Sequence, residues 1–269
     1  MWPSLLERCP SGHHLRRRIY PSWLGLAISL LLCAGLSRSP GLAGPGGPFP
    51  KGYGVGRDAD SNRVQSDYQA TWYSFRKTTA DLMESTGAAN AEAAALLLQI
   101  QTNAAFLGSK WDTWFKTNST SVRYPTGDEY LTSLHGDLRV LRRISKEKEQ
   151  RAALDALRDV ALDLQIKADN CRGSTDGLGK EILVRVHTKS GGKEIGGFEV
   201  CYVPKGLLDV KGAQDRFPRQ SSPTDERTLN PGRYAMWVRK RGFTGEPVIL
   251  SIGGHGETRC EIDLEVPTD

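Results

Sequence analysis

The sequence predicts two folded parts of different class, an antiparallel helical bundle followed by an antiparallel β-sandwich. Apolar residues recur at helical spacings of three and four from about residue 61 to 169. The pattern then changes to the alternation of strands, which continues from about 170 to 269. The glycine-containing stretch "DNCRGSTDGLG" lies at this change. We therefore place the border between the two domains there.

The composition is that of a globular protein without a strongly charged surface. The 269 residues are 38% hydrophobic and 25% charged, which is enough chain for two modest hydrophobic cores. The formal net charge is +5, but residues 1–43 carry +4 of it and leave +1 for the rest. A charge this small does not provide the basic surface that nucleic-acid binding requires.

Residues 1–43 are predicted to be a signal peptide. Three arginines at 16–18 precede the apolar run "WLGLAISLLLCAGL", and small residues follow it. This run is shorter than the roughly 20 residues of a membrane-spanning helix. Ala43 is the favoured cleavage point and Ser37 the alternative. An uncleaved segment that anchors the protein in a membrane is the remaining possibility.

Residues 44–60 are predicted to be a flexible tether. The segment reads "GPGGPFPKGYGVGRDAD" and is rich in glycine and proline. With export, the mature chain would be periplasmic, on the cell surface or secreted. An oxidising compartment would allow one disulfide among the three cysteines that remain after cleavage.

Four stretches between 61 and 169 have an apolar stripe of helical period. The second is rich in alanine and leucine and follows Asn90, a residue type that caps helices. The charged sequence "SKEKEQR" between the third and fourth is either a loop or the middle of one long helix. The other three stripes are Val64, Tyr68, Trp72, Phe75 and Leu82, then Leu131, Leu134, Leu138 and Leu141, then Ala153, Leu154, Leu157, Ala161 and Leu164.

The second part has the short, turn-separated strands of a sandwich. We predict strands at about 181–188, 195–203, 233–240, 247–252 and 257–266. The polar region 205–228 is a long excursion that holds a short strand or a helical turn. Because no helical pattern separates the strands, an antiparallel sandwich is favoured.

Two stretches of this part carry a family resemblance. "GGKEIGGFEVCYV" (191–203) contains Gly192, Lys193, Ile195, Gly197 and Val200, and "LNPGRYAMWVRKRGF" (229–243) contains Leu229, Pro231, Gly232, Tyr234, Gly242 and Phe243. Together they resemble the carboxypeptidase regulatory-like, or prealbumin-like, sandwich domains of exported proteins. The resemblance implies a folding, docking or ligand-recognition module and transfers no catalytic residues. The excursion at 205–228 departs from the compact family pattern.

No motif predicts a catalytic residue, a cofactor or a metal site. His135, His187 and His255 fall on different predicted elements and lack a partner at i+4. No G-x-S-x-G nucleophile elbow is present.

Two other patterns have structural explanations. Asp155, Asp159 and Asp163 recur every four residues, but Arg151 and Arg158 lie within helical reach, so we expect a solvated helix face. The aromatic residues of the helical part lie mostly at core spacing, which favours packing over a ligand groove.

The alternation of the strands orients the cysteines and one tryptophan. Cys201 is predicted to face outward and Cys260 inward, which disfavours a disulfide between these two. Cys171 precedes the first strand and could meet the start of the last strand if the two strands are neighbours. Cys171 to Cys260 is therefore the favoured disulfide. In strand 233–240, Trp237 is turned outward. An outward tryptophan is either covered by the helical domain, which we favour, or offered to a partner. Trp237 and the two arginines of the same face, Arg233 and Arg239, are therefore candidate interface residues.

Taken together, these features favour an exported, non-catalytic binding or docking module that recognises a protein, a peptide or a glycan. One alternative is a catalytic or ligand-sensing helical domain with the sandwich as an accessory. The other is a membrane-anchored structural protein with an uncleaved N-terminal segment.

Overall fold

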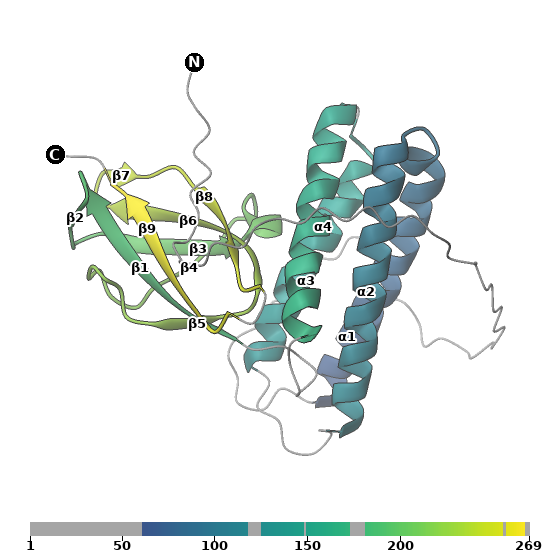
Figure 1. The fold of residues 1–269 in the computed structure, drawn as a ribbon, viewed down its shortest axis with the longest axis horizontal. Coiled ribbons are helices and arrows are strands. Elements are labelled where there is room, and N and C mark those ends of the chain that lie inside the picture. Colours follow the sequence, from purple (N-terminus) through teal and green to yellow (C-terminus); the bar gives the residue numbers. More distant parts are fainter. Residues whose placement is uncertain (1–60, 118–124, 148, 173–180, 255–256, 267–269) are drawn as a thin grey trace, which may run out of the picture. The chain divides into compact units, whose positions relative to one another are not determined.

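The computed structural model describes residues 61–117, 125–147, 149–172, 181–254 and 257–266. The predicted signal peptide and tether lie outside these ranges. The described part consists of long helices followed by strands in two sheets, as Figure 1 shows. The fold class is therefore α + β, as the change of period in the sequence predicts.

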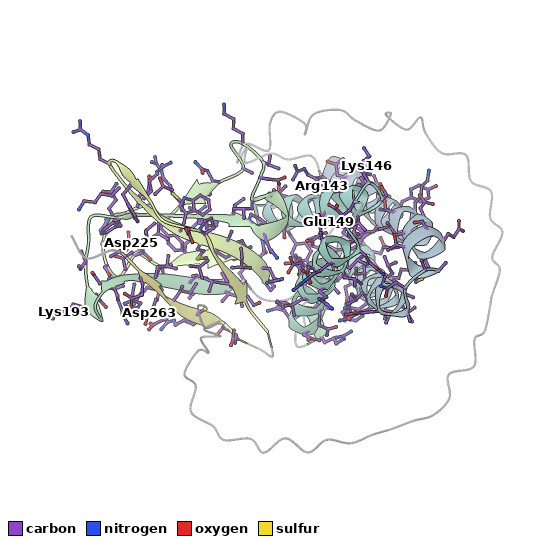
Figure 2. All side chains as sticks on the ribbon, turned by 90° about the horizontal axis from the view of Figure 1, so that it is seen from above. Arg143, Lys146, Glu149, Lys193, Asp225 and Asp263 are labelled. Atoms are coloured by element: carbon purple, nitrogen blue, oxygen red, sulfur yellow. The ribbon has the colours of Figure 1, made fainter. Side chains whose placement is uncertain are left out.

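In the first part, the helical region Ser61–Arg172, the described residues form four α-helices. Helix α1 contacts α2 and α3, and α4 contacts the same two helices. The charged sequence after α3 is a loop, around which Arg143, Lys146 and Glu149 gather (Figure 2). The helices are α1 Ser61–Leu82, α2 Ala91–Thr117, α3 Pro125–Ile144 and α4 Gln150–Arg172, with a π-helical turn η1 at Met83–Gly87.

Local sequence explains where these helices begin and what they bury. The side-chain oxygen of Asn90 accepts hydrogen bonds from the backbone N–H groups of Glu92 (2.9 Å) and Ala93 (3.1 Å), which makes it the N-cap of α2. The predicted stripes form the core, since Phe75 and Leu157 are fully buried. The aromatic rings of Tyr68 and Trp111 stack at 3.9 Å. This supports a packing role for these aromatics.

The second part, the β region Ile182–Glu265, contains two sheets. The 3₁₀ turn η2 (Lys205–Leu207) follows β3, so the excursion predicted at 205–228 does contain a helical turn and a short strand. The first sheet consists of β1 Ile182–Ser190, β2 Lys193–Glu194, β5 Arg227–Leu229 and β9 Arg259–Glu265. The second consists of β3 Glu199–Pro204, β4 Asp215–Arg216, β6 Gly232–Lys240, β7 Phe243–Thr244 and β8 Val248–Ile252.

The two sheets contribute to one hydrophobic core. Val184, Val200, Met236 and Ile262 all belong to it. Cys260 belongs to the same core, which confirms that it faces inward. One strand pair differs from the expected antiparallel arrangement, because β1 and β9 run parallel. These are the first and last strands of the region. Parallel neighbours cannot be joined by a hairpin, and β1 and β9 are connected by all the strands that lie between them in the sequence.

The expected disulfide between Cys171 and Cys260 is not formed, and both cysteines are buried. Cys171 lies in helix α4, whereas Cys260 belongs to the core between the two sheets. Burial raises the pKa of the Cys171 thiol to about 11. The two thiols are therefore enclosed in different hydrophobic surroundings.

Helix α3 and turn η2 approach each other through a pair of glycines. A Cβ atom added to Gly206 would lie 2.5 Å from the carbonyl carbon of Gly136, which leaves no room for a side chain. A Cβ atom added to Gly136 would lie 3.0 Å from Cγ of Leu207. The backbones therefore touch only because both positions are glycine.

We expect Gly206→Ala to lower the free energy of unfolding by about 1–3 kcal/mol, because the added methyl group must push rigid backbone apart. Urea unfolding followed by circular dichroism measures this change. Gly254→Ala is the matched control, since a Cβ atom there meets nothing within 4 Å. Equal stability of the two variants would show that the helix and the turn do not meet in this way.

Candidate functional site

A second contact between the helical and β regions joins α4 to the start of β6. The backbone N–H of Arg233 donates a 2.6 Å hydrogen bond to Oδ1 of Asp163. Gly232 has a φ of 154°, and a Cβ atom there would lie 2.8 Å from the same Oδ1. Because Gly232 of the "LNPG" turn has no side chain, the start of β6 can lie close enough to α4 for this hydrogen bond to form.

Lys167 forms the buried centre of this contact. It is 0% exposed and pairs with Asp163, one turn earlier in α4. Its Nζ lies 3.6 Å from Oδ2 of Asp137 on α3 and 5.9 Å from the centre of the Tyr130 ring. Burial lowers the pKa of Lys167 and raises the pKa of Asp137 to about 6, although the charge of Lys167 opposes the latter shift.

Asp159 extends the contact toward its exposed edge. Its carboxylate pairs with both Lys205 of η2 and the guanidinium of Arg233. Burial, followed by the charge of Arg233, lowers the pKa of Lys205 to about 8. Three carboxylates thus face three cations in what we call the ion cluster, formed by Asp137, Asp159, Asp163, Lys167, Lys205 and Arg233.

The ion cluster is suited to holding two regions together. Its charges balance, and they are supplied by α3, α4, η2 and β6. A buried pair adds little net stability compared with apolar packing, but loss of one partner leaves an uncompensated charge. The cluster therefore specifies which surfaces meet.

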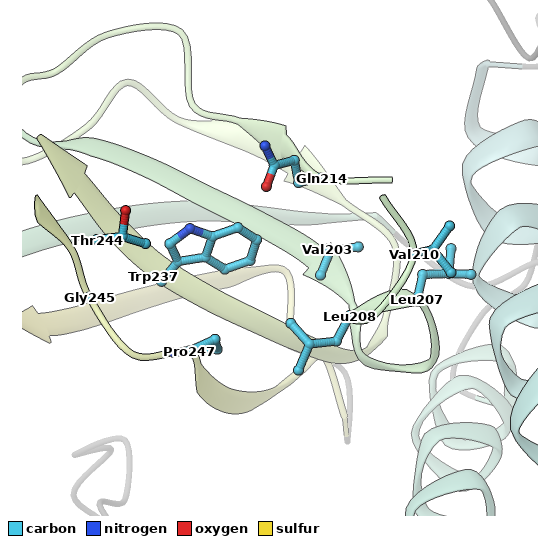
Figure 3. A pocket seen from close by; sticks show the side chains of 9 residues that line it. All are labelled: Val203, Leu207, Leu208, Val210, Gln214, Trp237, Thr244, Gly245 and Pro247. Atoms are coloured by element: carbon cyan, nitrogen blue, oxygen red, sulfur yellow. The ribbon is translucent and has the colours of Figure 1, made fainter. Parts of the chain in front are cut away.

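The second sheet carries a half-open pocket with Trp237 at its floor and Leu207 of η2 in its wall. Trp237 is 8% exposed and packs with Cys201, Val203 and Ala235 on the outer face of the sheet. Figure 3 shows its indole between Val203 and Thr244. The pocket has a volume of about 260 Å³ and is lined by Val203, Leu207, Leu208, Val210, Gln214, Trp237, Thr244, Gly245 and Pro247. We call it the Trp237 pocket.

The lining of the Trp237 pocket is apolar with two neutral polar groups. Gln214 and Thr244 supply the amide and hydroxyl, and no lining residue carries a charge. Leu208 keeps 41% of its surface exposed at the mouth. Such a pocket can bury an apolar group against an aromatic ring and offer it a small number of hydrogen bonds.

A cationic rim lies on the same face of the sheet. Arg239 is two residues beyond Trp237 on β6, and Glu199 lies opposite Arg239 in the register of β3 and β6. Glu199 accepts hydrogen bonds from Arg216 (2.6 Å) and Arg239 (2.8 Å), and these bonds lower its pKa. Two guanidinium groups share one carboxylate, so these three side chains together carry one net positive charge.

The three residues predicted as an interface therefore have separate roles. Arg233 contacts α4, Trp237 floors the pocket and Arg239 belongs to its rim. The alternation correctly turned Trp237 outward. The residues packed against it in the outer-face cluster come from the β region, whereas we had favoured cover by the helices.

The ion cluster is the part that the sequence patterns did not reveal. The solvated helix face predicted for Asp159 and Asp163 is wrong for Asp163, which is 4% exposed. One signal was available. Lys167 lies at the apolar stripe of α4, three residues after Leu164, where a lysine requires a buried partner.

Two of the three candidate histidines make side-chain hydrogen bonds within the fold. His135 hydrogen-bonds with Thr71 at 3.0 Å, and His187 with Glu194 at 2.7 Å, while His255 lies outside the described residues.

Among the described residues, no group of three or more potential ligands could hold a metal ion. Within the same ranges, no helix has the length and hydropathy needed to cross a membrane.

Comparison of the chain with protein-family models, with curated proteins and with solved structures finds no match. The features of the chain that bear on function are therefore the ion cluster, the Trp237 pocket and the rim.

The pH dependence of stability tests the buried position of Asp137. Its pKa is raised from 3.8 to about 6, so the native state holds a proton that the unfolded state has released between these values. Its stabilising contribution is complete below about pH 4 and is lost as the pH rises through about 6.

Asp137→Asn removes this titration. The difference in free energy of unfolding between Asp137→Asn and wild type should therefore change with pH. Between about pH 4 and 7 it should shift in favour of the variant, because only wild type loses the contribution of the protonated carboxyl group. Urea unfolding at each pH measures this difference. Asp225→Asn, at an exposed position, is the control. Parallel pH profiles for wild type and Asp137→Asn would contradict the assignment.

Proposed function

We propose that the protein is an exported, non-catalytic docking module with a prealbumin-like sandwich, which binds an extended segment of a partner protein at the Trp237 pocket. The observation that carries this proposal is an aromatic-floored pocket with an uncharged lining. A pocket of this kind supports recognition of an apolar side chain. The proposed export rests on the N-terminal sequence, which would place the partner in the envelope or outside the cell.

The rim suggests what lies beside that apolar side chain. Arg216 has 68% and Arg239 41% of its side chain exposed, although both contact Glu199. A carboxylate on the partner, close in sequence to the apolar residue, would complement the second positive charge. Such a contact at a solvated rim contributes up to about 1 kcal/mol, or roughly fivefold in affinity. We therefore propose an acidic segment with an apolar anchor.

The test uses three acetylated pentapeptides and the indole N–H resonance of Trp237, assigned by its loss in Trp237→Phe. The first peptide has a central leucine flanked by aspartates, the second replaces the aspartates by asparagines, and the third replaces the leucine by alanine. We expect the first to shift the Trp237 signal, the second to bind about fivefold more weakly, and the third to have no effect.

Arg216→Gln should reduce binding of the aspartate peptide to the level of the asparagine peptide. Arg219→Gln is its matched control, because Arg219 is also exposed and pairs with a different carboxylate, that of Asp225. A Trp237 signal that shifts with chitotriose and with none of the peptides would contradict peptide recognition and favour a glycan. No shift with either class of probe would refute the pocket as a binding site.

A further inference from the structure

One side of the Trp237 pocket is formed by the segment that contacts helix α3. Leu207, Leu208 and Val210 line the pocket, and all three belong to residues 205–213, which we call the wall segment. Figure 3 shows Leu207 and Val210 on the side opposite Thr244. The wall segment therefore has one face toward the pocket and another toward the helix.

Successive turns connect the wall segment internally. The backbone N–H of Leu208 bonds to the carbonyl of Lys205 at 3.2 Å, and that of Val210 bonds to the carbonyl of Leu207 at 2.9 Å. The N–H of Ala213 continues the series to Val210 at 3.2 Å. Each turn is therefore tied to the one before it by a backbone hydrogen bond.

One face of α3 holds the wall segment in place. Gly136, Arg139 and Arg143 recur at spacings of three and four, so they lie on the same side of the helix. Arg139 pairs with Asp209 of the wall segment, and Arg143 donates a 2.8 Å hydrogen bond to the same carboxylate. Asp209 lies directly between the two pocket residues Leu208 and Val210.

The contact at Gly136 sets how closely the wall segment approaches helix α3. Gly206 touches the backbone of Gly136, and Leu207, which is 2% exposed, lies against that same glycine. Lys205 is held separately by Asp159 of α4. The position of the pocket wall is therefore determined by three consecutive contacts with the helices and not by the sheet alone.

We infer that helix α3 positions the wall of the Trp237 pocket, with Arg139, Arg143 and Gly136 as positioning residues. Binding in the pocket is then linked to docking of the helical region. This inference rests on the binding function proposed above. A ligand that contacts the wall segment favours one position of it. The contact with the helices and the binding of the ligand then strengthen or weaken each other by the same factor. The helical region thereby gains a role in recognition without contacting the ligand.

Asp209→Asn tests this inference in the complete chain, because it removes the carboxylate that both arginines bind. Asp225→Asn is the matched control, since Asp225 is also an exposed aspartate of the β region paired with an arginine. Asp209→Asn should shift the Trp237 indole resonance and accelerate amide hydrogen exchange at Leu208, Val210 and Ala213. Asp225→Asn should change neither.

Affinity for the aspartate–leucine peptide provides the second measurement. It should fall about threefold or more in Asp209→Asn and stay unchanged in Asp225→Asn. Unaltered indole and amide signals in Asp209→Asn would overturn the positioning role, whether or not any peptide binds. Altered signals together with no peptide binding to wild type would support the positioning role while the proposed function fails. Equal affinity of both variants would overturn the linkage.

Discussion

A lysine that is fully buried is the constraint on which the arrangement of the two regions depends. Lys167 retains a compensated charge only while Asp163 and Asp137 remain beside it. Asp163 also accepts the backbone N–H of Arg233, so the lysine, its partner and the first residues of β6 form one connected group. This connection requires the absence of a side chain at Gly232. A change in any of these groups would leave a polar atom buried without its partner.

The long excursion after β3 gains a physical explanation from the same junction. Its length allows two contacts that a short hairpin cannot make. Gly206 and Asp209 contact α3, while Leu207 and Leu208 line the Trp237 pocket. A single segment thus faces the helices and the pocket, which is why the proposed binding site and the helical region are coupled.

The elements and the orientation of their side chains could be predicted from the sequence, because both depend on local periodicity. The stripes of α1, α3 and α4 follow directly from spacings of three and four. The orientations of Cys201, Trp237 and Cys260 follow from the alternation of β3, β6 and β9. The cap at Asn90 follows from its side-chain chemistry. These features require no knowledge of distant residues.

What the sequence did not predict depends on contacts between distant residues. Asp159 has Arg158 beside it in the chain, but its partners Lys205 and Arg233 are on other elements. The parallel pairing of β1 with β9 and the separate burial of Cys171 and Cys260 likewise depend on how the regions assemble. Periodicity could turn Trp237 outward, but it could not identify the segment that covers it.

If the ion cluster and the glycine contact hold the helical and β regions together, the two regions tumble as one unit. Backbone ¹⁵N relaxation measures the rotational correlation time of each region separately. We expect one common correlation time for residues 61–172 and 182–265. Two clearly different correlation times would show that the regions move independently and would contradict this expectation.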